Sequence, residues 1–305
     1  MAPPGTSGMG ALEEAAARAL GRPGAAAQFR LDAAAVAGGL RPAALLDYVP
    51  VEPAGANGVP RRRRGNRGKE VRDWEEGGGS AGLERAQGCA LARGARAAAA
   101  RLGGPGARPL VGVLRGTVML FSAEHSARLL QAQLSIFAHL KFSAGGRPSG
   151  WQARDTQILP GACQKALELL LLRGADGGGA DEVLDLDQAC APTAGRASLA
   201  PSSLVGWLLG YPVVYCFEEG GERAVAEVLG GAALSRVAVR ALSAEPAGSA
   251  AEIAAFTFPT ELPGAAAAVV AFSEHVQSLS GRIPELGSLE ISCRAVEANS
   301  CVIAI

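Results

Sequence analysis

Aromatic residues are scarce in this chain: phenylalanine, tyrosine and tryptophan together make up only 5% of its 305 residues. A hydrophobic core must therefore be built mostly from Ala, Leu and Val. Hydrophobic residues as a whole reach 49% and charged residues 19%, which is ordinary for a globular protein with a real core. The 41 glycines and 18 prolines indicate long loops around a folded body.

Long apolar runs and a net charge are also missing. The longest apolar candidate, Ala265–Phe272, is far shorter than the roughly 20 residues that span a bilayer. Residues 1–10 lack the basic region and apolar run of a secretory signal. The net charge is zero, which gives no overall preference for nucleic acid or an anionic membrane. By elimination we expect a soluble intracellular protein, cytoplasmic or alternatively nuclear, without a membrane partner.

Motifs for common cofactors do not occur. Neither GxGxxG nor GxxxxGK[ST] is present, and no pair of cysteines has the CxxC spacing of a zinc site. The sequence therefore predicts no nucleotide or zinc cofactor and leaves any other cofactor unknown. A disulfide framework is not expected, because the six cysteines are scattered over a long chain. Cys163, Cys216 and Cys293 fall within apolar patterns, where a cysteine behaves as a small hydrophobe.

Hydrophobic periodicity predicts one mixed α/β domain over residues 1–305. Helix and strand patterns alternate in the middle of the chain, which indicates a central sheet with helices packed on it. The C-terminal third predicts an antiparallel meander with one helix, because Arg236–Arg240 alternates arginines with small apolar residues at period two. A helix from Pro160 to Arg173 is expected to bury Leu167, Leu170 and Leu171.

Residues 52–82 differ in composition from the rest of the chain. Glycine, arginine and other polar residues dominate there, and few apolar residues are available to bury. We interpret this stretch as a disordered insertion into the domain. A mis-predicted exon is the alternative explanation.

The run from Ser202 to Phe217 is the most readable part of the sequence. It predicts a short helix capped by Ser202 or Ser203, a left-handed Gly210 that ends the helix, and a strand that follows at once. Five apolar or aromatic residues without polar alternation make up that strand. We therefore expect it to be covered on both faces and to form the centre of the sheet.

The three histidines are expected on helices and far from one another. His139 falls in a helix predicted over 123–140, where Leu130, Leu134 and Phe137 have helical spacing. A partly exposed surface histidine is the expected role for it.

Carboxylates provide the candidate chemistry. Asp185 and Asp187 flank Leu186 at the end of a strand predicted over 182–186, where alternation places both on one face. Such a pair binds a divalent metal or shares a proton in many sites, although two solvated residues at a strand end are the alternative. Asp47 near another predicted strand end is a third candidate. This set supports, as the alternative function, a carboxylate-dependent, metal-assisted enzyme that uses Asp185 and Asp187.

The basic run Arg61–Arg64 is the weaker functional candidate. Phosphate contacts or a nuclear address would need such a run. Acidic residues follow directly and largely neutralise it, and no aromatics are interleaved for base stacking. A solvated charged linker is favoured, so nucleic acid is not the expected partner.

Two segments resemble a known family. Gly39–Tyr48 and Gly206–Tyr215 are similar to the animal family named for chromosome 1 open reading frame 74. The resemblance extends over roughly residues 11–50 and 108–305 and implies an uncharacterised family with no assigned activity. It carries over no catalytic or binding residue. The leading expectation is therefore a protein of unknown function that acts without catalysis by binding a protein partner.

Overall fold

The computed structural model describes residues 23–46, 109–115, 117–123, 125–133, 135–143, 146, 148–154, 160–175, 183–191, 199–242 and 250–296. Within these ranges helices and strands form a mixed α/β fold, as the sequence predicts. Asp47, Arg61–Arg64 and the expected insertion at 52–82 lie outside the described residues.

None of the helices in the described part of the chain is long and apolar enough to cross a membrane.

Helices are interspersed with single strands and pairs of strands along the chain. In chain order the elements are α2 (Pro23–Ala37), β1 (Ala43–Leu45), β2 (Pro109–Leu114), β3 (Thr117–Ser122), α4 (His125–Ala132), β4 (Ile136–Phe142), β5 (Pro148–Arg154), α5 (Gly161–Ala175), β6 (Val183–Asp185), α6 (Asp187–Cys190), α7 (Pro201–Leu208), β7 (Val213–Cys216), α8 (Glu222–Gly230), β8 (Leu234–Leu242), β9 (Ala250–Pro259), α9 (Ala265–Leu279) and β10 (Ser288–Val296).

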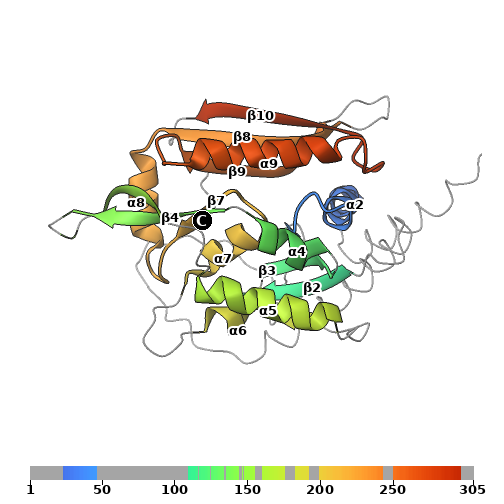
Figure 1. Cartoon of the computed structure of the whole chain (residues 1–305), viewed down its shortest axis with the longest axis horizontal. Helices are drawn as coiled ribbons and strands as arrows, with labels where there is room; N and C mark the ends of the chain where they lie inside the picture. Colours follow the sequence, from blue (N-terminus) through green and yellow to red (C-terminus); the bar gives the residue numbers. More distant parts are fainter. Residues whose placement is uncertain are drawn as a thin grey trace, which may run out of the picture.

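The strands of the described residues are divided over three sheets (Figure 1). Their orders are β1-β3-β2-β6, β5-β4-β7 and β10-β8-β9. Two neighbouring pairs are parallel, β2 with β6 and β4 with β7. Because parallel strands run in one direction, the carboxyl ends of β4 and β7 lie at the same edge of their sheet.

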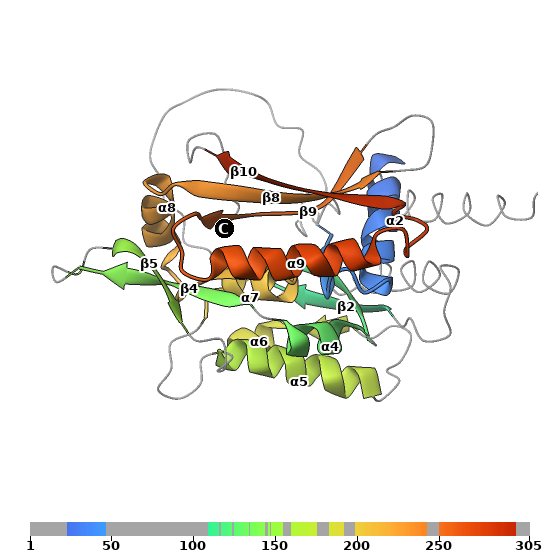
Figure 2. The same ribbon diagram turned by 45° about the horizontal axis from the view of Figure 1, so that its top comes forward.

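The C-terminal sheet is antiparallel, as expected. Val237 and Val239 of β8 are buried and the flanking Arg236 and Arg240 are half-buried, as predicted, while Ala238 between the valines is buried too. Helix α9 connects β9 to β10 and lies along the sheet (Figure 2). The chain returns so that β10 pairs with β8 rather than with β9.

The middle sheet, β5-β4-β7, is covered on both faces. On one face Phe137 and Val214 pack in a core that includes α5 and α7. On the other, Ala138 and Val213 pack in a core that includes β8, β9 and α9. The expectation that β7 is covered on both sides is confirmed.

The position of β7 within its sheet differs from the sequence prediction. β4 is the central strand and β7 lies at the edge, so the prediction that β7 is the centre of the sheet is wrong. Two packed layers are enough to make a strand apolar throughout, whether or not it has a neighbour on each side. The chain before α7 covers part of the edge through a bond from Ala200 N to Phe217 O of 2.9 Å.

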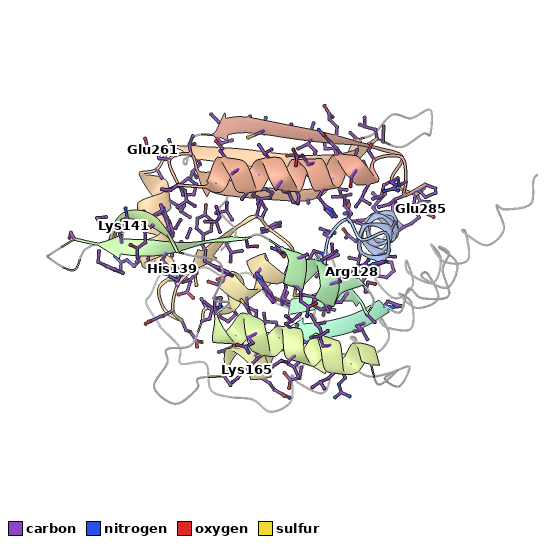
Figure 3. All side chains as sticks on the ribbon, viewed as in Figure 1. Arg128, His139, Lys141, Lys165, Glu261 and Glu285 are labelled. Carbon is purple, nitrogen blue, oxygen red and sulfur yellow. The ribbon has the colours of Figure 1, made fainter. Side chains whose placement is uncertain are left out.

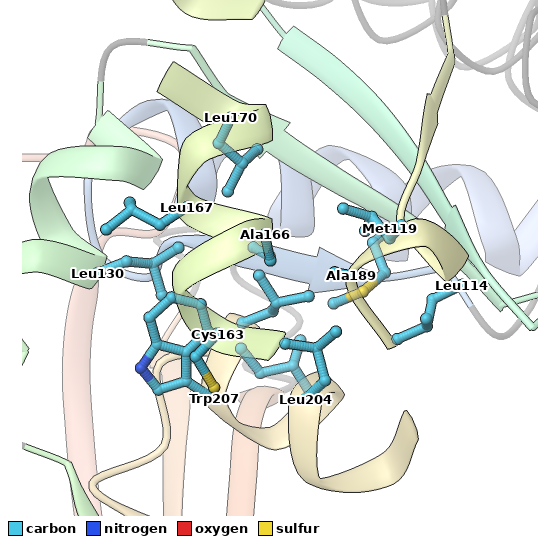
Figure 4. Packing of buried hydrophobic residues seen from close by; sticks show 14 of the residues in the cluster. Leu114, Met119, Leu130, Cys163, Ala166, Leu167, Leu170, Ala189, Leu204 and Trp207 are labelled. Carbon is cyan, nitrogen blue, oxygen red and sulfur yellow. The ribbon is translucent and has the colours of Figure 1, made fainter. Parts of the chain in front are cut away.

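A core of buried apolar side chains lies between the first two sheets and helices α4, α5 and α7 (Figure 4). Trp207 of α7 is fully buried there beside Cys163 of α5. Leu167 and Leu170 are buried as predicted, but Leu171 is 43% exposed, contrary to the prediction. The buried stripe of α5 is narrow, and Leu171 lies beyond its margin.

The prediction of a helix over 123–140 is confirmed for α4 and is wrong for the residues that follow it, which form β4. The side chains of Gln133 and Ser135 donate hydrogen bonds of 3.0 and 2.9 Å to the carbonyl oxygen of Tyr211. The N–H of Ile136 donates a hydrogen bond of 2.8 Å to the carbonyl oxygen of Pro212, the residue after Tyr211. These contacts with the chain before β7 begin strand β4 in place of further helical turns, so His139 lies on a strand.

Helix α7 begins at Pro201 rather than at a serine. Its N-cap is Ala200, which makes no side-chain capping bond, so the expected cap by Ser202 or Ser203 is wrong. Proline suits the first helical position because no hydrogen bond is needed from its nitrogen there. Gly210 has φ of 80°, and the predicted left-handed stop is confirmed.

A buried ion pair joins α2 to the segment before β1. Arg41 Nη2 donates to Asp32 Oδ1, and their side chains are 10% and 3% exposed. Gln28 Nε2 lies 3.3 Å from the same oxygen. Breaking a pair of this kind by removing one partner costs about 3–5 kcal/mol, because the other charge is left buried. The pair therefore fixes how α2 enters the fold.

Gly210→Ala is expected to lower the free energy of unfolding by about 1–3 kcal/mol. An added Cβ would lie 2.5 Å from Pro42 Cδ, in a backbone conformation that disfavours L-residues. Gly230→Ala is the control, because an added Cβ at this α8 position meets nothing within 4 Å. Urea unfolding should show a loss for Gly210→Ala and no loss for Gly230→Ala. Equal stability of the two variants would contradict this packing.

Candidate functional site

A cleft of about 1080 Å³ opens where β4 and β7 end. The first turn of α5, the end of α6 and the start of α8 complete its walls. In open α/β sheets, ligands bind at the carboxyl ends of parallel strands. We call this the β4–β7 cleft; its polar or thiol-bearing walls include His139, Lys141, Gln152, Lys165, Cys190, Cys216 and Glu218.

Three side chains form a row across the sheet at the floor of the cleft. His139 is the register partner of Cys216 in the parallel β4–β7 pair and of Gln152 in the antiparallel β4–β5 pair. Register partners on neighbouring strands project to the same face, with Cβ atoms about 5 Å apart. All three residues also line the cleft. We call them the Gln152–His139–Cys216 row.

Strand alternation explains which way the row faces. Phe137 and Val214, two residues before His139 and Cys216, point toward α5 and α7. Ala138, between Phe137 and His139 on β4, points to the core on the opposite face of the sheet. The row therefore lies on the α5 side of the sheet, where the helical layer ends and the cleft begins.

Two lysines, one on β4 and one on α5, lie on different walls of this cleft (Figure 3). Lys141 is exposed near the end of β4, and Lys165 is half-buried in the second turn of α5. The first helical bond at the start of α5 runs from Gln164 N to Pro160 O at 3.1 Å. The earlier N–H groups of α5 belong to the positive end of the helix dipole. These groups add positive potential to the wall opposite β4.

Three buried thiols converge beside the cleft. Cys163 of α5, Cys190 of α6 and Cys216 of β7 all belong to the same core. Burial raises the pKa of the Cys163 thiol well above its usual value, and the nearby Cys216 and Cys190 add to the shift. Burial also raises the pKa of Cys190, with a further contribution from Asp187. Cys163 and Cys190 are therefore protonated at neutral pH.

Arg115 organises the loops next to the thiols. Its backbone N–H donates to Asp187 Oδ1 at 2.8 Å, and its Nη2 donates to Glu219 Oε1 at 2.8 Å. Its φ is 48°, in a region that few residues other than glycine adopt. Both bonds hold this turn in place between the ends of β2, α6 and β7.

The predicted carboxylate pair lies at this turn. Asp185 ends β6 and Asp187 opens α6, with Asp187 N donating to Asp185 Oδ1 at 3.1 Å. The structure thus brings the two aspartates together, and both carboxylates accept backbone hydrogen bonds. Within the described ranges, no group of three or more histidine, cysteine or acidic side chains is placed to hold a metal ion. The metal site stays a prediction.

His139 is the residue that sequence reasoning misjudged. The prediction placed it on the surface of a helix, whereas it lies half-buried on β4 in the cleft. Ile136, Ala138 and Leu140 alternate at period two, and that signal indicates a strand. The competing helical spacing of Leu130, Leu134 and Phe137 hid it.

A second, more apolar pocket of about 550 Å³ lies between α7, β7 and β9. Tyr211, Tyr215 and Phe256 line it, and Arg115 and Arg236 lie at its walls. Both arginines already pair with glutamates, Arg115 with Glu219 and Arg236 with Glu252. The pocket therefore presents mainly aromatic and aliphatic surface.

Comparison of the chain with protein-family models, with curated proteins and with solved structures found no match. The resemblance to the family named for chromosome 1 open reading frame 74 stays a prediction.

The thiols are expected to differ widely in reactivity. Cys293 is exposed on β10, whereas Cys163 is buried and has a raised pKa. Because the thiolate is the reactive form, iodoacetamide at pH 7 should modify Cys293 at least about 10-fold faster than Cys163. Peptide mapping by mass spectrometry over time measures both rates, and unfolding in urea is the control that should equalise them. Equal rates in the folded protein would contradict the burial of Cys163.

Proposed function

We propose that this chain binds a small molecule with a carboxylate or phosphate group in the β4–β7 cleft. The observation that carries the proposal is the convergence of polar side chains from separate elements on one cleft at the carboxyl ends of two parallel strands. The volume, about 1080 Å³, is at the upper end of the range for small-molecule sites. A cleft of this size holds a metabolite together with ordered water.

The charge balance in the cleft supports an anionic ligand. Lys141 and Lys165 line it, whereas Glu168, one turn after Lys165 in α5, does not line it and Glu219 is already paired with Arg115. Glu218 is the remaining carboxylate in the wall. Two lysines against one such carboxylate favour a ligand with negative charge.

The expectations from sequence remain alternatives of a different kind. Binding of a protein partner needs an apolar contact surface. Large exposed apolar side chains of the described residues come from four elements, namely Phe142 of β4, Leu171 and Leu172 of α5, Leu242 of β8 and Val270 of α9. The cleft brings polar, charged and thiol-bearing side chains together in one place, whereas these apolar side chains are spread over four elements. A cytoplasmic location is consistent with a small-molecule ligand and is part of this proposal.

Citrate tests the proposal. At constant ionic strength, 10 mM citrate should raise Tm by about 2–4 °C if its Kd is near 1 mM. Lys165→Met should remove most of this shift, because it deletes a cation from the wall of the cleft. Arg223→Met is the matched control, since Arg223 is an exposed cation of α8 that does not line the cleft.

A substitution that fills the cleft gives the second arm of this test. Ala162→Trp, in the first turn of α5, should abolish the citrate shift by occupying the space. Ala226→Trp places the same side chain on the exposed face of α8, outside the cleft, and should keep the shift. A citrate shift that survives both Lys165→Met and Ala162→Trp would refute the proposed site.

A further inference from the structure

We infer that the Gln152–His139–Cys216 row is a nucleophilic site that attacks the carbonyl carbon of an acyl compound bound in the β4–β7 cleft. The inference rests on the proposed function for where the substrate binds. It adds the class of substrate and the residues that act on it.

The register of the sheet carries this inference. Cys216 and His139 are partners across the parallel β4–β7 pair, and Gln152 is the partner of His139 on the other side. A cysteine becomes a strong nucleophile when an adjacent base takes its proton and a third group orients that base. The row has these three groups in the required order, with the imidazole between the thiol and the amide.

Surroundings distinguish Cys216 from the other two buried thiols. Cys216 lies beside an imidazole and lines the cleft. Cys163 is covered completely and does not line it. Cys190 lines the cleft, but its burial and, after that, the acidic Asp187 raise its pKa and favour the protonated form.

The groups that face Cys216 act on its proton in both directions. The glutamates that follow β7 disfavour a thiolate, whereas Cys163 of α5 and Cys190 of α6 are neutral thiols that add no charge. His139 of β4 favours it, together with the lysines of β4 and α5. The imidazole is the closest of the favouring groups by register, so it is placed to take the proton of the thiol.

The reaction follows from this pair. The Cys216 Sγ–H proton passes to His139, and the thiolate attacks the carbonyl carbon of R–CO–X. The C–X bond breaks, X leaves as HX with the proton from His139, and R–CO remains on Sγ as a thioester. Water then attacks the thioester and gives a proton to His139. The C–S bond breaks, the acid R–COOH leaves and Sγ is released as thiolate beside protonated His139, so R–CO–X and water become R–COOH and HX.

4-Nitrophenyl acetate is the probe, because it carries no anionic group and reports on the thiol chemistry alone. It should acetylate Cys216 in the folded full-length chain, and release of 4-nitrophenolate gives the rate. His139→Gln should lower this rate by about 100-fold. His125→Gln is the matched control and should leave the rate unchanged, since it makes the same change at a histidine of α4 that does not line the cleft.

The pH profile separates a reactive pair from an ordinary thiol. Wild type should react at a nearly constant rate from about pH 6.5 to 8.5, whereas in His139→Gln the rate should rise through this range as a lone thiol ionises. Gln152 is a positioning residue. Gln152→Ala should narrow the pH range over which the rate is constant. Gln152→Glu should restore that range, because the carboxylate again accepts a hydrogen bond from the imidazole.

Tm measurements confirm that each variant is folded, and prior alkylation of Cys216 in Cys293→Ser, which lacks the exposed thiol of β10, gives a second test. Alkylated protein should release no 4-nitrophenolate beyond the control without protein. The inference is overturned if acetyl groups appear on other cysteines but not on Cys216, or if His139→Gln keeps the wild-type rate and profile. A citrate shift without Cys216 acetylation would overturn this inference alone. Cys216 acetylation without a citrate shift would overturn the anionic ligand of the proposed function.

Discussion

The parallel pairing of β4 with β7 is the constraint on which the rest of this structure depends. It begins where Gly210 ends the α7 turn and where Ser135 and Ile136 bond to the chain before β7. Because side chains alternate along a strand, a shift of one residue would move each of them to the opposite core. The register therefore determines which residues reach the β4–β7 cleft.

Two packed cores hold this register in place. On the α5 side, Phe137 and Val214 lie against a cluster centred on Trp207. On the other side, Ala138 and Val213 lie against residues of β8, β9 and α9. Both faces of the pair are thus specified by burial of apolar side chains, which is the dominant favourable term in folding. The Gln152–His139–Cys216 row can lie only at the end of the strands, where the layer that contains α5 and α7 ends.

Local signals in the sequence were enough to predict the elements whose periodicity is unambiguous. Gly210 as a helix stop, the α5 stripe with Leu167 and Leu170, and the alternation of β8 all depend on neighbours in the chain. β4 has a local period-two signal, but a competing helical spacing hides it, and its start depends on hydrogen bonds to Tyr211, far along the sequence. The edge position of β7 also depends on pairing that apolar composition does not reveal.

The candidate site was predictable only in part for the same reason. Asp185 and Asp187 are close in sequence, and their proximity in the structure follows from that. Cys216 and His139 are brought together by strand pairing alone, and the sequence presents them as a small hydrophobe and a surface histidine. Glu219 and Arg115 likewise meet only through the fold, at a turn with positive φ.

The central claim is that strand pairing makes Cys216 a thiolate beside an imidazolium. Ultraviolet absorbance of thiolate, measured as the difference between wild type and Cys216→Ser across the pH range, tests it most directly. The pairing predicts that Cys216 contributes thiolate absorbance already below about pH 7, and that His139→Gln removes this contribution. A contribution that appears only above about pH 8.5, and does not change in His139→Gln, would contradict the account.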